Sequence, residues 1–263
     1  MLTVVNIFSI GGNMSNQIYI EIENVKKKIE ESLKRYGEYS TELIELYEEI
    51  ADLYCSLNEF EECRYYLLKV LNIKKHFYGE TNIALIKTYD QLATVADEKE
   101  EIIYYFSEVI RIKELMYGTK HIETANTYVE LANVYVYLAE YDKAEKYYLI
   151  ALEIYSSKED CGREEVGCYN ELASIYWEIE KLEESVFYAK KAFEKSKEIY
   201  GENHHDTACH ALSVAIMYDE MNMIDESLEY FEIAVKLFET LYGEEGEDTI
   251  FARKEMQKTL NRK

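Results

Sequence analysis

Apolar residues recur at spacings of three and four along almost the whole chain, in pairs of segments divided by short polar breaks. Residues 124–138 carry Tyr128, Leu131 and Tyr135 on one side, which is the spacing of a helix with one buried face. A break begins at Ala139, and a second apolar face with the same spacing follows it. The pattern predicts pairs of helices joined by short turns.

The helix pairs repeat at a nearly constant period. A Tyr-Gly pair marks the period at Gly37, Gly79, Gly118, Gly201 and Gly243, and Cys161-Gly162 fills the remaining place. Successive glycines of this set are 42, 39, 44, 39 and 42 residues apart, a period typical of a helical repeat array. We expect five repeats, at about 37–78, 79–117, 118–161, 162–200 and 201–242.

Each repeat places residues of the same kind at the same points of its two helices. Small residues such as Ala132 and Ala144 let the helices approach closely, and aromatic residues fill the grooves between them. The equivalent core positions predicted in the first two repeats are Tyr47, Ile50, Ala51, Tyr54, Phe60, Cys63, Leu67, Val70, Leu71, Tyr89, Leu92, Ala93, Ala96, Ile102, Phe106, Val109 and Ile110.

A further helix is expected before the repeats. Residues 17–36 place Val25, Ile29 and Leu33 on one face, as a lone second helix packed on the first repeat would. Residues 1–13 are apolar, and we expect them either to be disordered or to lie upstream of a true start at Met14.

A capping helix is expected after the repeats, at 248–262. Phe251, Met256 and Leu260 are predicted to face inward. Its other side is basic, with Arg253, Lys254, Lys258, Arg262 and Lys263. Polar terminal caps are what repeat arrays require, so residues 14–263 are predicted to form a single array.

This pattern resembles the tetratricopeptide repeat (TPR), with an aromatic residue, Leu, a small residue and Tyr on the first helix of each pair. The starts Gly118-Thr-Lys-His-Ile-Glu-Thr-Ala and Gly201-Glu-Asn-His-His-Asp-Thr-Ala look like the kinesin-light-chain type. The chain departs from the family pattern at Ala96 and Ala211 and by lacking proline. The resemblance implies an all-α fold, a right-handed α-solenoid whose first helices line a concave groove that binds partner peptides.

Composition limits the classes of partner. The 263 residues include no proline and ten glycines, which favours long helices over turn-dense β folds or a phosphate-binding glycine loop. The net charge is −23, and because residues 1–36 sum to +1 and 251–263 to +4, residues 37–250 carry −28. Such a charge repels nucleic acid and anionic membranes, so neither is an expected partner.

The cysteines indicate the compartment. The chain has five, Cys55, Cys63, Cys161, Cys168 and Cys209, with no C-x-x-C pair. An odd number in a chain of this length suggests free thiols in a reducing compartment, and we expect a cytoplasmic protein.

No catalytic site, metal site or cofactor is expected. The strongest metal candidate is His204-His205-Asp206 with His210, but His121 occupies the same place in another repeat without such a cluster. We therefore interpret these residues as helix-start chemistry, in which an acid favours the helix dipole. Cys161 and Cys168 are interpreted as ordinary small apolar residues rather than a redox pair.

The candidate site is the groove face of the first helices, which the helical register identifies. Its N-terminal half is acidic, its middle has asparagines whose amides can hold a peptide backbone, and Trp177 offers an apolar anchor together with Val136, Leu212 and Ile216. Some proteins of the family that this pattern resembles bind acidic C-terminal tails through a cluster of basic residues in the groove. Only one base, Lys87, is expected on this face, so we do not expect this chain to bind such tails. The predicted groove residues are Glu45, Glu48, Glu49, Asp52, Asp90, Asp97, Asn126, Glu130, Asn133, Tyr137, Asn170, Glu171 and Trp177.

Three functions fit these patterns. The first is a non-enzymatic scaffold whose acidic groove binds a basic or mixed basic and apolar peptide segment with salt-sensitive affinity. The second is a regulatory sensor whose groove binds a small peptide or a partner enzyme. The third is a self-associating structural protein, a homo-oligomer. The alternative to all three is that the groove positions are solvated residues that bind no ligand.

Overall fold

The protein is helical throughout the part that the structure describes. The computed structural model describes residues 3–262, with side chains from residue 15 onward. Helix α1 spans Thr3–Tyr36 and the capping helix α12 spans Glu247–Leu260. Between them lie α2 (Glu42–Ser56), α3 (Phe60–Tyr78), the 3-10 helix η1 (Ile83–Leu85), α4 (Ile86–Thr94), α5 (Lys99–Tyr117), α6 (Ile122–Tyr137), α7 (Tyr141–Ser156), α8 (Gly162–Glu178), α9 (Leu182–Tyr200), α10 (His205–Glu220) and α11 (Ile224–Tyr242).

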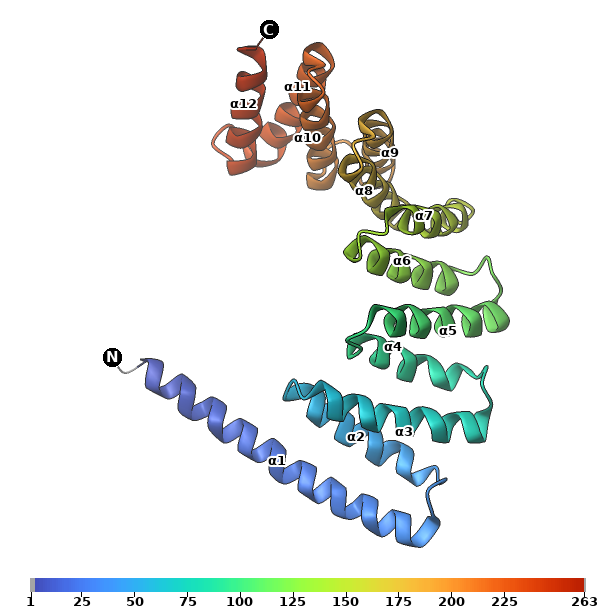
Figure 1. Cartoon of the computed structure of the whole chain (residues 1–263). Coiled ribbons are helices and arrows are strands. Elements are labelled where there is room, and N and C mark those ends of the chain that lie inside the picture. The colour runs from blue at the N-terminus through green and yellow to red at the C-terminus, as the bar shows by residue number, and fades with distance from the viewer. Residues whose placement is uncertain (1–2, 263) are drawn as a thin grey trace. The chain divides into compact units, whose positions relative to one another are not determined.

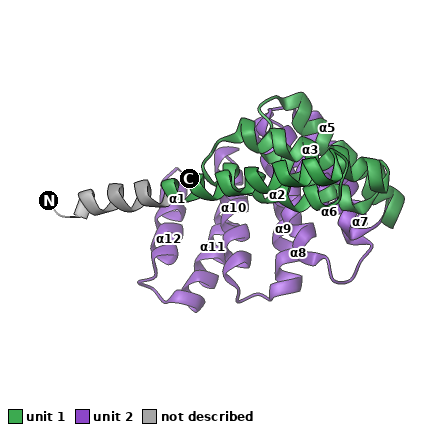
Figure 2. Cartoon of the chain, turned by 90° about the horizontal axis from the view of Figure 1, so that it is seen from below, with its two compact units in different colours: residues 1–119 green, residues 120–263 purple. Residues whose placement is uncertain are grey.

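The helices form two compact units, residues 1–119 and residues 120–263 (Figure 2). Within each unit every helix packs against the next one in the chain, so α2 pairs with α3, α6 with α7, and α10 with α11 (Figure 1). This order is that of the predicted all-α solenoid. No helix in the described part is both long and apolar enough to cross a bilayer.

Five of the six periodic glycines, Gly37, Gly79, Gly118, Gly201 and Gly243, each follow the end of a helix, whereas Gly162 is the first residue of α8. Gly79 has a φ of 82° and Gly201 one of 88°, a left-handed region in which a side chain would be strained. The turn inside a helix pair also needs one left-handed residue, supplied by Asn58, Ala139, Glu180 and Asn222. The second repeat turns from α4 into α5 without one, in agreement with its shorter sequence there.

Stacked tyrosines hold the two helices of a repeat together. Tyr147 of α7 lies between Tyr128 and Tyr135 of α6, with ring centroids 5.9 Å and 5.7 Å apart. Tyr188 is placed in the same way between Tyr169 and Tyr176, and Tyr66 between Tyr47 and Tyr54. Aromatic packing therefore accounts for much of the high tyrosine content.

Some predicted core positions are wrong. Phe60 begins α3 directly after the turn from α2, and it is 43% exposed. On α5 the buried aromatic residue is Tyr105, and the predicted Phe106 is partly buried and packs against the same core. Phe251 and Leu260 are also exposed, since α12 turns a face of small residues inward, with Thr249, Ala252 and Thr259 buried.

Ion pairs attach the capping helix to the repeat before it. The guanidinium group of Arg253 lies 2.7 Å from Glu239 of α11, and that of Arg262 lies 2.8 Å from Asp219 of α10. Part of the predicted basic surface of α12 is thus neutralised within the array. Helix α1 includes residues 3–13, for which we expected either disorder or a place upstream of a true start at Met14, and that expectation stays a prediction.

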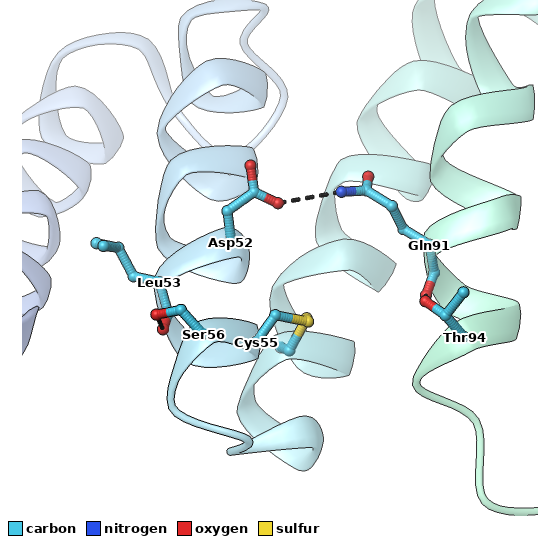
Figure 3. Close-up of a disulfide and its surroundings, with 7 residues drawn as sticks. Asp52, Leu53, Cys55, Ser56, Gln91 and Thr94 are labelled. Carbon is cyan, nitrogen blue, oxygen red and sulfur yellow. Dashed lines mark hydrogen bonds between the residues drawn. A yellow bond between two sulfur atoms is a disulfide. The ribbon is translucent and has the colours of Figure 1, made fainter. Parts of the chain in front are cut away.

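The expectation of five free thiols is wrong for two of them. Cys55 at the end of α2 and Cys63 in α3 form a disulfide, with Cα atoms 5.5 Å apart (Figure 3). The tight turn around Asn58 brings the two helix ends together, which spacing alone did not reveal. Cys161, Cys168 and Cys209 are free, and only these three support the argument for a reducing compartment.

Candidate functional site

The predicted groove residues lie on the first helices of the repeats, with one exception. Asp97 follows the end of α4 and lies exposed in the turn before α5. First helices of neighbouring repeats contact each other within each unit, because Gln91 of α4 donates to Asp52 of α2 and Asn170 of α8 pairs with His210 of α10. We call these surfaces the first-helix faces of unit 1 and unit 2.

The first-helix face of unit 1 contains a buried base that the sequence did not predict. The ammonium group of Lys74, on α3, lies 2.7 Å from Glu48 of α2 and 3.0 Å from the hydroxyl of Thr88. Lys113 occupies the equivalent place on α5 and lies close enough to Asp90 to influence its pKa. Lysines of the second helices thus partly neutralise the charge of two predicted acids, Glu48 and Asp90.

The remaining acids of unit 1 differ in environment. Glu45 and Glu49 are exposed and form no ion pair within the described residues. Asp52 accepts a hydrogen bond of 3.1 Å from Gln91, whose side chain points toward it from α4 (Figure 3). Burial raises the pKa of Asp90, one of whose oxygens has no hydrogen-bond partner in the described part. The exposed negative charge is therefore concentrated on α2.

In unit 2, buried tyrosines of α7 hold two of the predicted asparagines of α6 in place. Tyr155 of α7 donates a hydrogen bond of 2.7 Å to the side-chain oxygen of Asn126, and Tyr148 donates to that of Asn133. Both tyrosine rings are buried, so the amide oxygens are held by the core. An amide whose oxygen is occupied presents its two N–H donors to a ligand.

The next first helix, α8, adds a mixed polar segment. Asn170 lies 2.9 Å from the ring of His210, and burial lowers the pKa of that imidazole. Burial also raises the pKa of Glu171. Glu130 is exposed on α6, and Tyr137, at the end of α6, is 87% exposed.

A pocket of about 340 Å³ lies between α8 and α10. Trp177, Ile216 and Met217 form its apolar part, so two residues of the predicted anchor site come together and Met217 joins them. Val136, Tyr137 and Leu212 are not among its lining residues. Glu178 and Glu220 also line the pocket, together with Ser174 and Ser213. Met217 was not predicted from the sequence, where it was assigned neither to the core nor to the groove face.

Within the histidine cluster, His204 caps the start of α10, whereas His210 lies inside that helix and pairs with Asn170. The Nδ1 atom of His204 accepts a hydrogen bond of 3.2 Å from the backbone N–H of Asp206, and His121 caps α6 in the same way at 3.1 Å. These caps satisfy N–H groups that a helix start leaves free. No group of three or more metal-ligating side chains is clustered in the described part.

The free cysteines are poorly suited to redox chemistry. Burial raises the pKa of Cys168 to about 12 and also raises that of Cys161, the opposite of what activates a thiol. Cys209 lies 3.3 Å from His205, but burial and the nearby carboxylates of Asp248 and Asp206 raise the pKa of its thiol too.

Sequence comparison identifies the repeats. The family model of the tetratricopeptide repeat matches residues 96–157 and 167–240, just over half of the chain. No curated protein sequence matches the chain.

Solved structures with the same fold share little sequence with the chain. The apo form of RapI has 18% identity and a TM-score of 0.66, over 95% of this chain and 72% of that one. A Podosopora anserina protein described as a kinesin light chain with nearly identical TPR-like repeats has 16% identity and a TM-score of 0.58, over 74% and 94% of the two chains. YrrB, a TPR protein with an unusual peptide-binding site, has 16% identity and a TM-score of 0.50, over 86% and 97%.

Proposed function

Because this chain belongs to the tetratricopeptide repeat family, whose members bind protein or peptide partners, we propose that it is a non-enzymatic scaffold for a basic and apolar partner segment. The segment would lie on the first-helix face of unit 2. Its backbone would be held by asparagine amides and its side chains by carboxylates and the α8–α10 pocket. We further propose that the protein acts in the cytoplasm.

The α8–α10 pocket carries this proposal. An apolar side chain can enter beside Trp177 and Ile216, while Glu178 and Glu220 are placed to pair with a flanking lysine or arginine. Aromatic anchors in pockets supply most of the binding energy in many interfaces, and rim charges supply specificity and on-rate. No lysine or arginine lines this pocket, so an acidic segment would be disfavoured.

Two further features support a peptide ligand. The core-held oxygens of Asn126 and Asn133 leave N–H donors for the carbonyl groups of an extended chain. The first-helix face of unit 1 has exposed negative charge of its own, from the carboxylates of Glu45 and Glu49. YrrB, a fold relative, has a peptide-binding site of its own.

The test is selection from a displayed library of random short peptides against the full chain. We expect enriched peptides to combine an aromatic or aliphatic residue with lysine or arginine, and their affinity to fall as salt is added. The double variant Glu178→Lys, Glu220→Lys should lose them. The matched control Glu229→Lys, Glu232→Lys reverses two exposed charges on α11 and should retain them. Acidic peptides whose binding is lost in the Glu178→Lys, Glu220→Lys variant would refute the proposal, as would basic peptides whose binding ignores both salt and that variant.

A further inference from the structure

A second pocket of unit 2 lies between the second helices α9 and α11. It holds about 280 Å³ and has an apolar floor of Phe193, Ile233 and Leu237. Phe193 and Ile233 are only half-buried, so their apolar surface remains available to a ligand. The other lining residues are polar: Lys197, Glu202, Asn203, Thr207, Lys236 and Thr240.

The charge of this pocket is opposite to that of the array. Lys197 is paired with Glu202 at 2.5 Å, whereas Lys236 is exposed and forms no ion pair within residues 3–262. The pKa of Glu202 is lowered from its ordinary value, mainly by Lys197 and to a smaller extent by Lys236. The ammonium groups of both lysines are therefore close enough to interact with the same carboxylate. The lining has two lysines and one glutamate, which leaves a net positive charge.

The combination of an apolar floor with a net positive charge is not found in every pocket on the second helices. A pocket on α7, for example, has three acids in its lining, Asp142, Glu145 and Glu153, but only one lysine, Lys146. Its net charge is therefore negative. In a region where residues 37–250 carry −28, a positive apolar pocket is a local reversal. Complementary charge directs partner choice and orientation more than it adds affinity.

We propose that the α9–α11 pocket is a second docking site, which binds a partner segment through an apolar side chain with an aspartate or glutamate one or two residues away. The apolar side chain packs on Phe193, Ile233 and Leu237. The carboxylate pairs with Lys236, and the side-chain amide of Asn203 offers further hydrogen bonds at the rim. The chain would then connect two segments of opposite charge, one on each side of unit 2.

The probe is again a displayed library of random short peptides, selected on the full chain and counter-selected on Lys236→Glu. Lys236 is exposed, so this substitution should leave the fold intact. We expect peptides that combine an apolar residue with a nearby acid. Fluorescence anisotropy of a labelled selected peptide should show about a tenfold or greater loss of affinity in Lys236→Glu. Thr240→Trp, which fills the exposed rim, should give the same loss.

Two control variants show whether the selected peptide binds at this pocket. Lys254→Glu reverses an exposed charge on α12 and should leave the affinity unchanged. The Glu178→Lys, Glu220→Lys variant should also leave it unchanged, which keeps this result independent of the α8–α10 pocket. Failure to enrich acidic and apolar peptides, or affinity that survives both Lys236→Glu and Thr240→Trp, would overturn the proposal. A dimer in light scattering that dissociates in Lys236→Glu would overturn it too, because a second copy would then be the occupant.

Discussion

The ammonium group of Lys74 and the carboxylate of Glu48 lie 2.7 Å apart, but they are buried to different degrees. The side chain of Lys74 is 9% exposed and that of Glu48 is 23% exposed. A glutamate that loses its partner can turn toward water, whereas the lysine cannot. The pair is therefore energetically asymmetric, and this asymmetry can be measured.

Removing the acid should cost more stability than removing the base. Glu48→Ala leaves a buried ammonium group with Thr88 alone, and we expect a loss of about 2–3 kcal/mol in the free energy of unfolding. Lys74→Met removes the buried charge and should cost less than about 1 kcal/mol. The double variant should resemble Lys74→Met. Urea unfolding of the three variants checks this, and equal losses for the two single variants would contradict it.

Two glycines of helix α8 should respond to alanine in opposite directions. A Cβ atom at Gly162 would meet Cγ2 of Ile199 at 2.6 Å, so Gly162→Ala should destabilise the protein by about 1–3 kcal/mol. Gly167 has nothing within 4 Å of the corresponding position, so Gly167→Ala should stabilise the helix by about 0.5–1 kcal/mol. Thermal unfolding of both variants tests the packing of α8 against α9 directly.

The turn at Ala139 is strained, and glycine should relieve it. Ala139 has a φ of 55°, a left-handed conformation that is unfavourable for a residue with a Cβ atom. We expect Ala139→Gly to raise the free energy of unfolding by about 0.5–1 kcal/mol, after the added entropy of the unfolded chain is subtracted. Asn58→Gly at the equivalent turn is the control, with a smaller gain because asparagine tolerates this conformation. A loss of stability in Ala139→Gly would rule out the strain.

Asp90 should make stability depend on pH. Burial raises its pKa in the folded state, so the folded protein binds this proton more readily than the unfolded chain does. The stabilising contribution is present below the ordinary pKa of 3.8 and is lost as pH rises through the higher folded value. Asp90→Asn should therefore stabilise the protein at neutral pH, by less than about 1 kcal/mol because the group is only partly buried. The advantage should shrink toward acid pH, and a gain that is constant with pH would show that Asp90 does not titrate in this way.

The helix pairs and most of their core followed from the sequence because periodicity determines which face is buried. Exposure at helix ends did not follow, since Phe60 at the start of α3 and Leu260 at the end of α12 have the spacing of core positions but are 43% and 47% exposed. The long side chain of Lys74 reaches a partner on another helix, so its pairing with Glu48 required three-dimensional information. The same holds for the hydrogen bond between Tyr155 and Asn126.

The pocket between α8 and α10 contains Trp177, the single tryptophan of the chain, in a protein with 26 tyrosines. Excitation energy absorbed by nearby tyrosines passes to tryptophan, so much of the emitted light will originate at this one place. The protein thus carries its own optical reporter. A ligand that enters beside Trp177 will shift or quench that emission without any added dye, while a ligand on the far side of the helix layer will leave the spectrum nearly unchanged.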